Sequence, residues 1–139
     1  MERILVGIDA SRPSWEALVR ALCLASRIES RVLVLVVFEN GDKGRPPGGP
    51  VLEEVETRIR SAKAAGATVT LAVARGRFDK EIVDAAKKEK ATLVVAANPD
   101  GQSGERETSS LGGILGGVGC RVELVSRKRN HEGKKDVTR

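Results

Sequence analysis

Residues 31–38 have the sequence Arg-Val-Leu-Val-Leu-Val-Val-Phe, and this segment is the strongest indication of the fold class. Its branched and aromatic apolar residues favour a β-strand. Because successive side chains of a strand point to opposite faces, and apolar residues occupy both sets of positions, both faces must be covered. Strands that are buried on both faces are typical of parallel sheets with helices on either side.

Four more strands are expected outward from this one, at residues 3–8, 68–74, 92–97 and 121–125. The segments between the strands carry apolar residues at helical spacing, which predicts four helices. These apolar positions are Trp15, Leu18, Val19, Leu22 and Ala25; then Val51, Leu52, Val55 and Ile59; then Phe78, Ile82, Ala85 and Ala86; and finally Leu111, Ile114, Leu115 and Val118. The alternation predicts an α/β fold, a three-layer sandwich of a five-stranded parallel sheet and four helices.

The net charge of +5 is concentrated in residues 127–139, which contain six basic and two acidic residues. Residues 1–126 are therefore nearly neutral, and nucleic-acid binding is not expected. We predict one α/β domain over residues 1–126, followed by a basic, solvated tail over residues 127–139. The alternative for the tail is weak attachment to an anionic partner. Apolar runs are too short for a membrane span, no secretion signal is recognised, and a cytoplasmic location is expected.

Asp9 stands at the carboxyl end of the first strand, where parallel α/β sheets bind ligands. Its carboxylate is suited to accept hydrogen bonds from ribose hydroxyls, and the alternative is that it only forms the turn into the first helix. Ser11 is the candidate N-cap of that helix.

The loop after the fourth strand, residues 98–110, is the second candidate ligand segment. Gly101 and Gly104 leave backbone N–H groups open, and Thr108, Ser109 and Ser110 stand where the next helix is expected to begin. Free N–H groups at a helix start attract anions, so a phosphate site is one interpretation. An ordinary polar loop with Ser or Thr capping is the other.

Groups for catalysis are scarce in this sequence. The single histidine, His131, lies in the tail, and tyrosine is absent. Cys23 and Cys120 have neither metal-site spacing nor a histidine nearby, and we expect both to be free, buried thiols. The sequence therefore predicts neither catalytic residues nor a metal site.

Several segments carry a family resemblance in their order and spacing along residues 1–126. They are Ile4-Leu-Val-Gly-Ile-Asp9-Ala-Ser11, Val32-Leu-Val-Leu-Val-Val37, Val73-Ala-Arg-Gly76, Ala91-Thr-Leu-Val-Val95 and Gly119-Cys120-Arg121-Val122-Glu-Leu-Val125. Together they resemble the universal stress protein family. The resemblance implies strand order 3-2-1-4-5, which puts Asp9 and residues 98–110 on either side of one crevice. It also implies a homodimer, formed through the edge strand at residues 122–125.

The same resemblance implies a nucleotide site that is partly rewritten here. Nucleotide-binding members carry Gly-x2-Gly-x9-Gly-Ser/Thr directly after the fourth strand. Ala96 and Pro99 stand at the first two glycine positions, and Thr108 stands one residue early at the third, whereas Ser109 keeps its type. Proline has no N–H to donate to phosphate. Asp9 matches the ribose-contacting residue, and Val37 matches the residue whose backbone meets adenine.

The full candidate set for a bound ATP or AMP is Ile8, Asp9, Val37, Ala96, Gly101, Gly104, Thr108, Ser109 and Ser110. Because the phosphate half of this set is altered, the predicted function is that of a non-catalytic stress-response regulator acting as a homodimer with protein partners. The alternative is an ATP- or AMP-binding switch with at most slow ATP hydrolysis.

Overall fold

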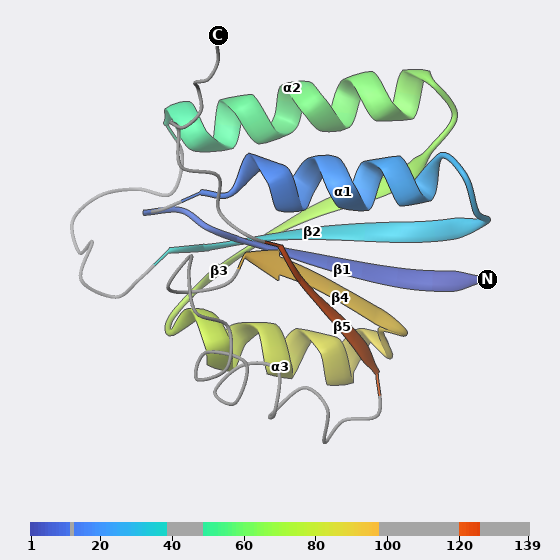
Figure 1. The fold of residues 1–139 in the computed structure, drawn as a ribbon. Helices are drawn as coiled ribbons and strands as arrows, with labels where there is room; N and C mark the ends of the chain where they lie inside the picture. Colours follow the sequence, from blue (N-terminus) through green and yellow to red (C-terminus); the bar gives the residue numbers. More distant parts are fainter. Residues whose placement is uncertain (12, 39–48, 98–119, 126–139) are drawn as a thin grey trace, which may run out of the picture.

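The computed structural model describes residues 1–11, 13–38, 49–97 and 120–125. These residues form five strands and three helices, and strands and helices alternate along the chain as far as β4 (Figure 1). The elements are β1 (Glu2–Asp9), α1 (Trp15–Ala25), β2 (Ser30–Phe38), α2 (Pro50–Ala64), β3 (Thr68–Arg75), α3 (Phe78–Glu89), β4 (Leu93–Ala97) and β5 (Arg121–Val125). All five strands lie within two residues of the bounds expected from the sequence.

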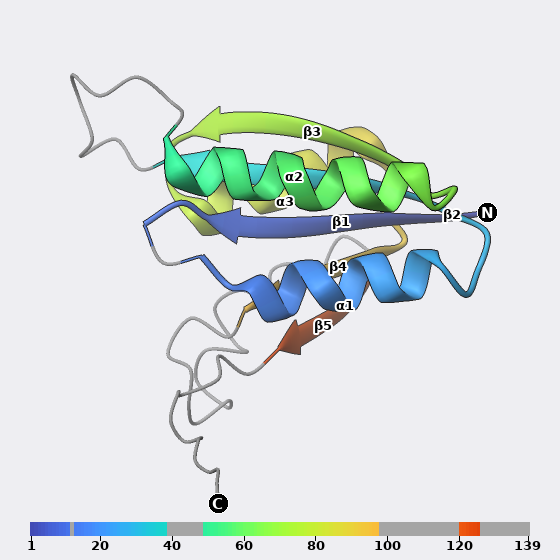
Figure 2. The same ribbon diagram turned by 90° about the horizontal axis from the view of Figure 1, so that it is seen from above.

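The strands form one parallel sheet in the order β3-β2-β1-β4-β5, so the expected order is confirmed. In the register of the central strands, Arg3 lies opposite Arg31 and Asp9 lies opposite Val37. All strands point the same way, so their carboxyl ends gather at one edge of the sheet (Figure 2).

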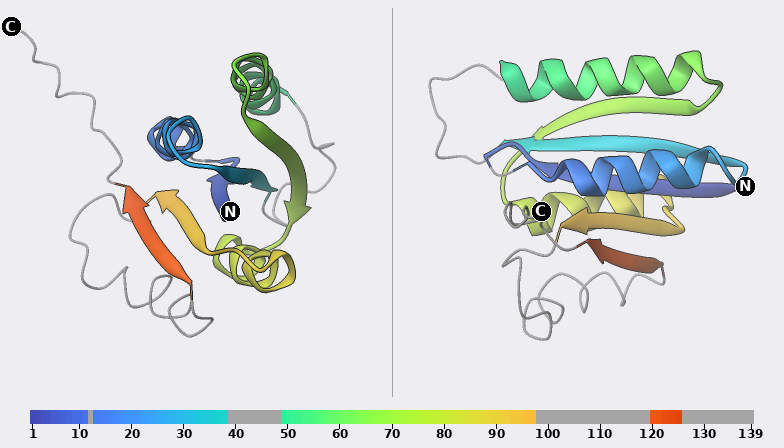
Figure 3. Two further views of the ribbon diagram at one scale, coloured as in Figure 1. Left: turned by 90° about the vertical axis from the view of Figure 1, so that its right-hand side faces the viewer. Right: turned by 45° about the horizontal axis from the view of Figure 1, so that its top comes forward.

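Helices α1 and α2 cover one face of the sheet and α3 covers the other, which gives three layers (Figures 1 and 3). Two apolar clusters fill the spaces between the layers. The cluster beneath α1 and α2 contains Leu18, Val34 and Val55, and the cluster beneath α3 contains Leu35, Val94 and Ile82. This division follows from the alternation of side chains along each strand.

The expectation of four helices is not borne out, because the described residues contain three. The segment expected to form the fourth, with Leu111, Ile114, Leu115 and Val118, lies outside the described residues, as does the basic tail at 127–139. None of the helices in the described ranges has the length and apolar character needed to cross a membrane.

The start of α1 differs from the sequence expectation. Ser14, not Ser11, is its N-cap, and the Ser14 hydroxyl accepts a hydrogen bond from the Ala17 N–H at 3.3 Å. Such a bond satisfies one of the free N–H groups of the first helical turn. Ser11 is thereby left to interact with Asp9.

Candidate functional site

The carboxyl edge of the sheet contains the point where strand order reverses. The chain moves from β1 to β2 and β3 on one side, then returns to β4 and β5 on the other. Ligands of open α/β sheets bind at such a switch point. The ends of β2, β1 and β4 carry Phe38, Asp9 and Ala97 there. Phe38 and Ala97 are 8% exposed, so the half-buried Asp9 is the polar side chain among these three strand ends.

Asp9 is held in one position by a short turn. Its Oδ1 accepts hydrogen bonds from the Ser11 N–H at 3.0 Å and from the Ser11 hydroxyl at 2.8 Å. This is an Asx turn, in which a carboxylate bonds to the backbone two residues ahead. Within the described residues both bonds are made to Oδ1, so Oδ2 keeps its capacity to accept from a ligand. The turn that sequence reasoning offered as an alternative role is therefore compatible with ligand contact.

The side chains of Ile8, Val37 and Ala96 are fully buried and pack into the sheet's two cores. Ile8 lies in the cluster beneath α1 and α2, whereas Val37 and Ala96 lie in the cluster beneath α3. These three residues therefore support the strand ends from opposite faces. Only their backbone groups are left for contact with a ligand.

The backbone of Val37 is already engaged in the sheet. Its carbonyl accepts a hydrogen bond from the Ala10 N–H at 2.9 Å, and the Phe38 carbonyl accepts from the Gly76 N–H at 2.9 Å. A carbonyl oxygen has two lone pairs, so Val37 retains one acceptor position. Its candidate contact with adenine therefore has to share the oxygen with Ala10.

The phosphate half of the candidate set lies outside the described residues. Gly101, Gly104, Thr108, Ser109 and Ser110 all fall within residues 98–119. The structure thus brings together Ile8, Asp9, Val37 and Ala96 at or next to the strand ends. Ser11 is the contributor that sequence reasoning assigned to a different role. An Asp can bond to the backbone N–H two residues ahead, so the spacing of Asp9 and Ser11 permits this turn.

The two cysteines lie away from this edge, Cys23 near the end of α1 and Cys120 just before β5. Both cysteines are free, as expected, but Cys23 is exposed and Cys120 is half-buried, so the expectation that both are buried was wrong. Burial raises the pKa of the Cys120 thiol. Among the described residues, no three His, Cys, Asp or Glu side chains are grouped so as to hold a metal ion.

Comparison with known proteins gives one family. A sequence model described as the universal stress protein family matches residues 1–118. No curated protein sequence matches the chain.

Solved structures with the same fold are also found. A universal stress protein in complex with cAMP is 24% identical with a TM-score of 0.67, and the alignment covers 91% of this chain and 98% of that chain. The protein UspA from Lactobacillus plantarum is 22% identical with a TM-score of 0.58, covering 89% and 97%. An Arabidopsis thaliana family protein with AMP bound is 11% identical with a TM-score of 0.58, covering 100% of both chains. At these identities the likeness shows the fold.

Proposed function

The chain belongs to the universal stress protein family, and we propose that it is a cytoplasmic stress-response protein that regulates by binding, without catalysis, as a homodimer. One observation carries the proposal: at the switch point, the ends of β2, β1 and β4 place one turn-held carboxylate between two hydrocarbon side chains, Phe38 and Ala97. A single fixed acceptor is suited to hold a ligand hydroxyl. General acid–base hydrolysis instead needs a proton donor and a base placed at the reacting atoms.

Phosphate release from ATP tests the absence of catalysis. The full chain is incubated with ATP and Mg²⁺ beside the Asp9→Asn variant, and we expect the same background rate from both. Asparagine keeps the oxygen that Ser11 needs, so the turn survives while the carboxylate is lost. Faster release by the unmodified chain than by the variant contradicts the proposal.

A nucleotide-binding switch is the second candidate, and the geometry of Asp9 favours it. The Oδ2 of Asp9 is able to accept a hydrogen bond from a ribose hydroxyl. In addition, two proteins of the same fold were crystallised with cAMP and AMP. The ligand for this chain is then an adenine nucleotide. Its phosphate contacts would come from Gly101, Gly104 and Thr108–Ser110, because the sequence offers free backbone N–H and hydroxyl groups there.

Titration calorimetry with AMP and cAMP tests this candidate. The Asp9→Asn substitution replaces one acceptor by an N–H₂ donor, and loss of a hydrogen bond to a charged group costs roughly tenfold or more in affinity. We expect that loss with no change in the unfolding temperature. An unchanged affinity in Asp9→Asn excludes Asp9 as the ribose contact.

The proposed homodimer uses the outer edge of β5, which is the last strand of the sheet in the part of the chain that the structure describes. The Arg121 N–H donates to the Thr92 carbonyl of the neighbouring segment, so the backbone groups of Arg121, Glu123 and Val125 point toward β4. The backbone groups of Val122 and Leu124 therefore point away from β4, where a second copy can pair with them.

Two substitutions at one position separate pairing from packing. Leu124→Pro removes an outward N–H, whereas Leu124→Ala keeps that N–H and removes the same side chain. We expect a monomer from the first variant and a dimer from the second in analytical ultracentrifugation. Dimers from both variants place the interface elsewhere.

A further inference from the structure

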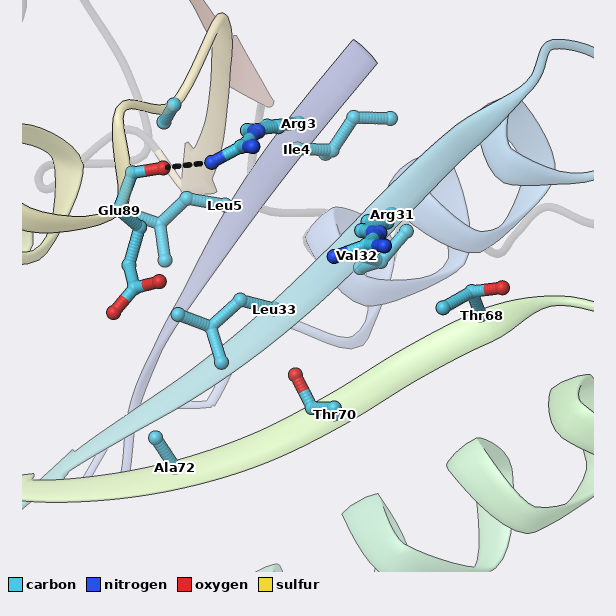
Figure 4. A pocket seen from close by; sticks show the side chains of 11 residues that line it. Arg3, Ile4, Leu5, Arg31, Val32, Leu33, Thr68, Thr70, Ala72 and Glu89 are labelled. Carbon is cyan, nitrogen blue, oxygen red and sulfur yellow. Dashed lines mark hydrogen bonds between the residues drawn. The ribbon is translucent and has the colours of Figure 1, made fainter. Parts of the chain in front are cut away.

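A groove lies on the α3 face of the sheet, at the amino ends of the strands and away from Asp9. It has a volume of about 350 Å³. Its walls include Arg3 on β1, Arg31 and Leu33 on β2, and Thr70 and Ala72 on β3 (Figure 4). Glu89, at the end of α3, closes one side. The volume falls in the range of small-molecule sites.

The charge in this groove is unbalanced. Arg3 and Arg31 lie directly opposite each other in the parallel register of β1 and β2. Like charges that face each other across strands are unfavourable. The Arg3 guanidinium donates one hydrogen bond to the Glu89 carbonyl at 3.2 Å, and within the described residues the Arg31 side chain has neither a hydrogen bond nor an ion pair.

Most of the guanidinium donors in the groove are therefore unused. Each arginine carries five N–H donors in a planar fork that matches carboxylate and phosphate oxygens. The Glu89 carboxylate is the other charge on the groove, and within the described residues it forms no ion pair with either arginine. Arg3 and Arg31 thus offer guanidinium donors to the groove, and within the described residues neither forms an ion pair.

Farther from the two arginines, the floor of the groove is formed mainly by apolar side chains. Leu33 is half-buried and lies opposite Thr70, and Leu5, which is 1% exposed, lies on the other side of Leu33. Ala72 continues the same face of β3, and its small side chain leaves space above the sheet. Figure 4 shows Leu33, Thr70 and Ala72 extending along the groove from the arginine end.

We propose that this groove binds a small organic anion with a short hydrocarbon body. The anionic group lies between Arg3 and Arg31, and the hydrocarbon body lies over Leu33 and Ala72. This site is distinct from the candidate nucleotide site, which lies at the opposite ends of the same strands.

Four probes separate the two parts of the ligand. The isotope-labelled full chain is titrated with hexanoate, hexyl phosphate, hexanol and acetate, and the amide signals of Thr68, Thr70 and Ala72 are followed by NMR. We expect saturable shifts with hexanoate or hexyl phosphate, and the tighter of the two identifies the anionic group. Hexanol lacks the negative charge and acetate lacks the hydrocarbon body. We therefore expect the affinity of each to be at least roughly tenfold lower than that of the six-carbon anions.

Three single variants test the charges. Arg31→Gln weakens binding about tenfold, because a charge-assisted bond is lost. Glu89→Gln strengthens binding, because a like charge is removed from the groove. Arg27→Gln, an exposed arginine outside the groove, leaves affinity unchanged and is the matched control. The proposal is overturned if neither six-carbon anion saturates, or if Arg27→Gln weakens binding as much as Arg31→Gln does.

Discussion

The two faces of the sheet are built from the same strands, yet they are covered differently. Beneath α1 and α2, alternate residues of the central strands such as Val6 and Val34 are fully buried. On the α3 face, β2 changes along its length: Val37 is fully buried, Leu33 is half-buried and Arg31 is exposed. Two described helices cover the first face, and one covers the second (Figure 3).

Helix coverage determines which residue types occur along a strand. Where α3 covers β2, the residues that face α3 are the core residues Leu35 and Val37. Beyond the end of α3, the same face carries Arg3, Arg31, Thr68 and Thr70. A polar residue in a strand that is apolar on both faces therefore marks the limit of helix coverage.

The largest difference in the free energy of unfolding is expected between two leucine substitutions, one on each face of the sheet. Leu18→Ala, beneath α1, empties a fully buried position and costs about 2–5 kcal/mol in the free energy of unfolding. Leu33→Ala, in the groove, removes a half-buried side chain and costs less than about 2 kcal/mol. Urea denaturation measures both, provided that the slopes agree. If Leu33→Ala costs as much as Leu18→Ala, the two faces are covered equally.

The second effect concerns Gly7, where the backbone of β1 lies close to side chains of α3. A Cβ at Gly7 would overlap the Ile82 Cδ1 and come within 3.2 Å of the Phe78 Cζ. Gly7→Ala is therefore expected to cost about 1–3 kcal/mol through overpacking. The measurement is thermal or urea unfolding of the variant.

Ile82→Val provides the matched test, because valine lacks the overlapping Cδ1. Alone it costs about 0.5–1.5 kcal/mol. Combined with Gly7→Ala, it is expected to relieve the overlap, so the double variant loses less than the sum of the single losses. Additive losses would show that Gly7 acts through backbone freedom and not through contact with α3.

Much of the fold was predictable from the sequence, because the pattern of apolar residues and the order of strands and helices both indicate a parallel sheet covered by helices. The continuous apolar run in β2 predicted a strand covered on both faces, and the repeat of strand and helix predicted a parallel sheet. The N-cap was wrong because Ser11 and Ser14 both precede α1, and only the geometry shows that Asp9 engages Ser11. Short polar residues compete for the same backbone donors, so sequence alone does not rank them.

The candidate site was predictable only in part. The position of Asp9 after an apolar strand predicts its place at the carboxyl edge, and the structure has it there. The groove with Arg31 was not predicted, because Arg31 was assigned to the first position of a buried strand. Its partner Arg3 lies 28 residues earlier, and only the register of β1 and β2 brings the two together.

The smallest expected effect concerns charges at the amino ends of the strands. Glu2 is paired: its carboxylate accepts hydrogen bonds from the Thr92 hydroxyl at 2.6 Å and from Arg121 at 3.0 Å. The Thr92 hydrogen bond, and then Arg121, lower the pKa of Glu2 from its ordinary value of 4.5. The ionised carboxylate therefore stabilises the folded state above that ordinary value, and this contribution is lost as pH falls through the lowered pKa. Glu2→Gln is expected to reduce stability slightly at pH 7 and to match the unmodified chain in acid.

Arg31→Gln gives the opposite sign, because it removes one of two facing like charges and breaks no ion pair. In the absence of an added anion, we expect it to raise the free energy of unfolding by about 0.2–1 kcal/mol. Arginine stays protonated, so this gain persists in acid, but salt screens the repulsion and reduces it. Urea unfolding of both variants at pH 7 and pH 3, at low and high salt, measures the contrast. A loss of stability in Arg31→Gln would mean that Arg31 already has a favourable partner, and the charge in the groove would then need no ligand to balance it.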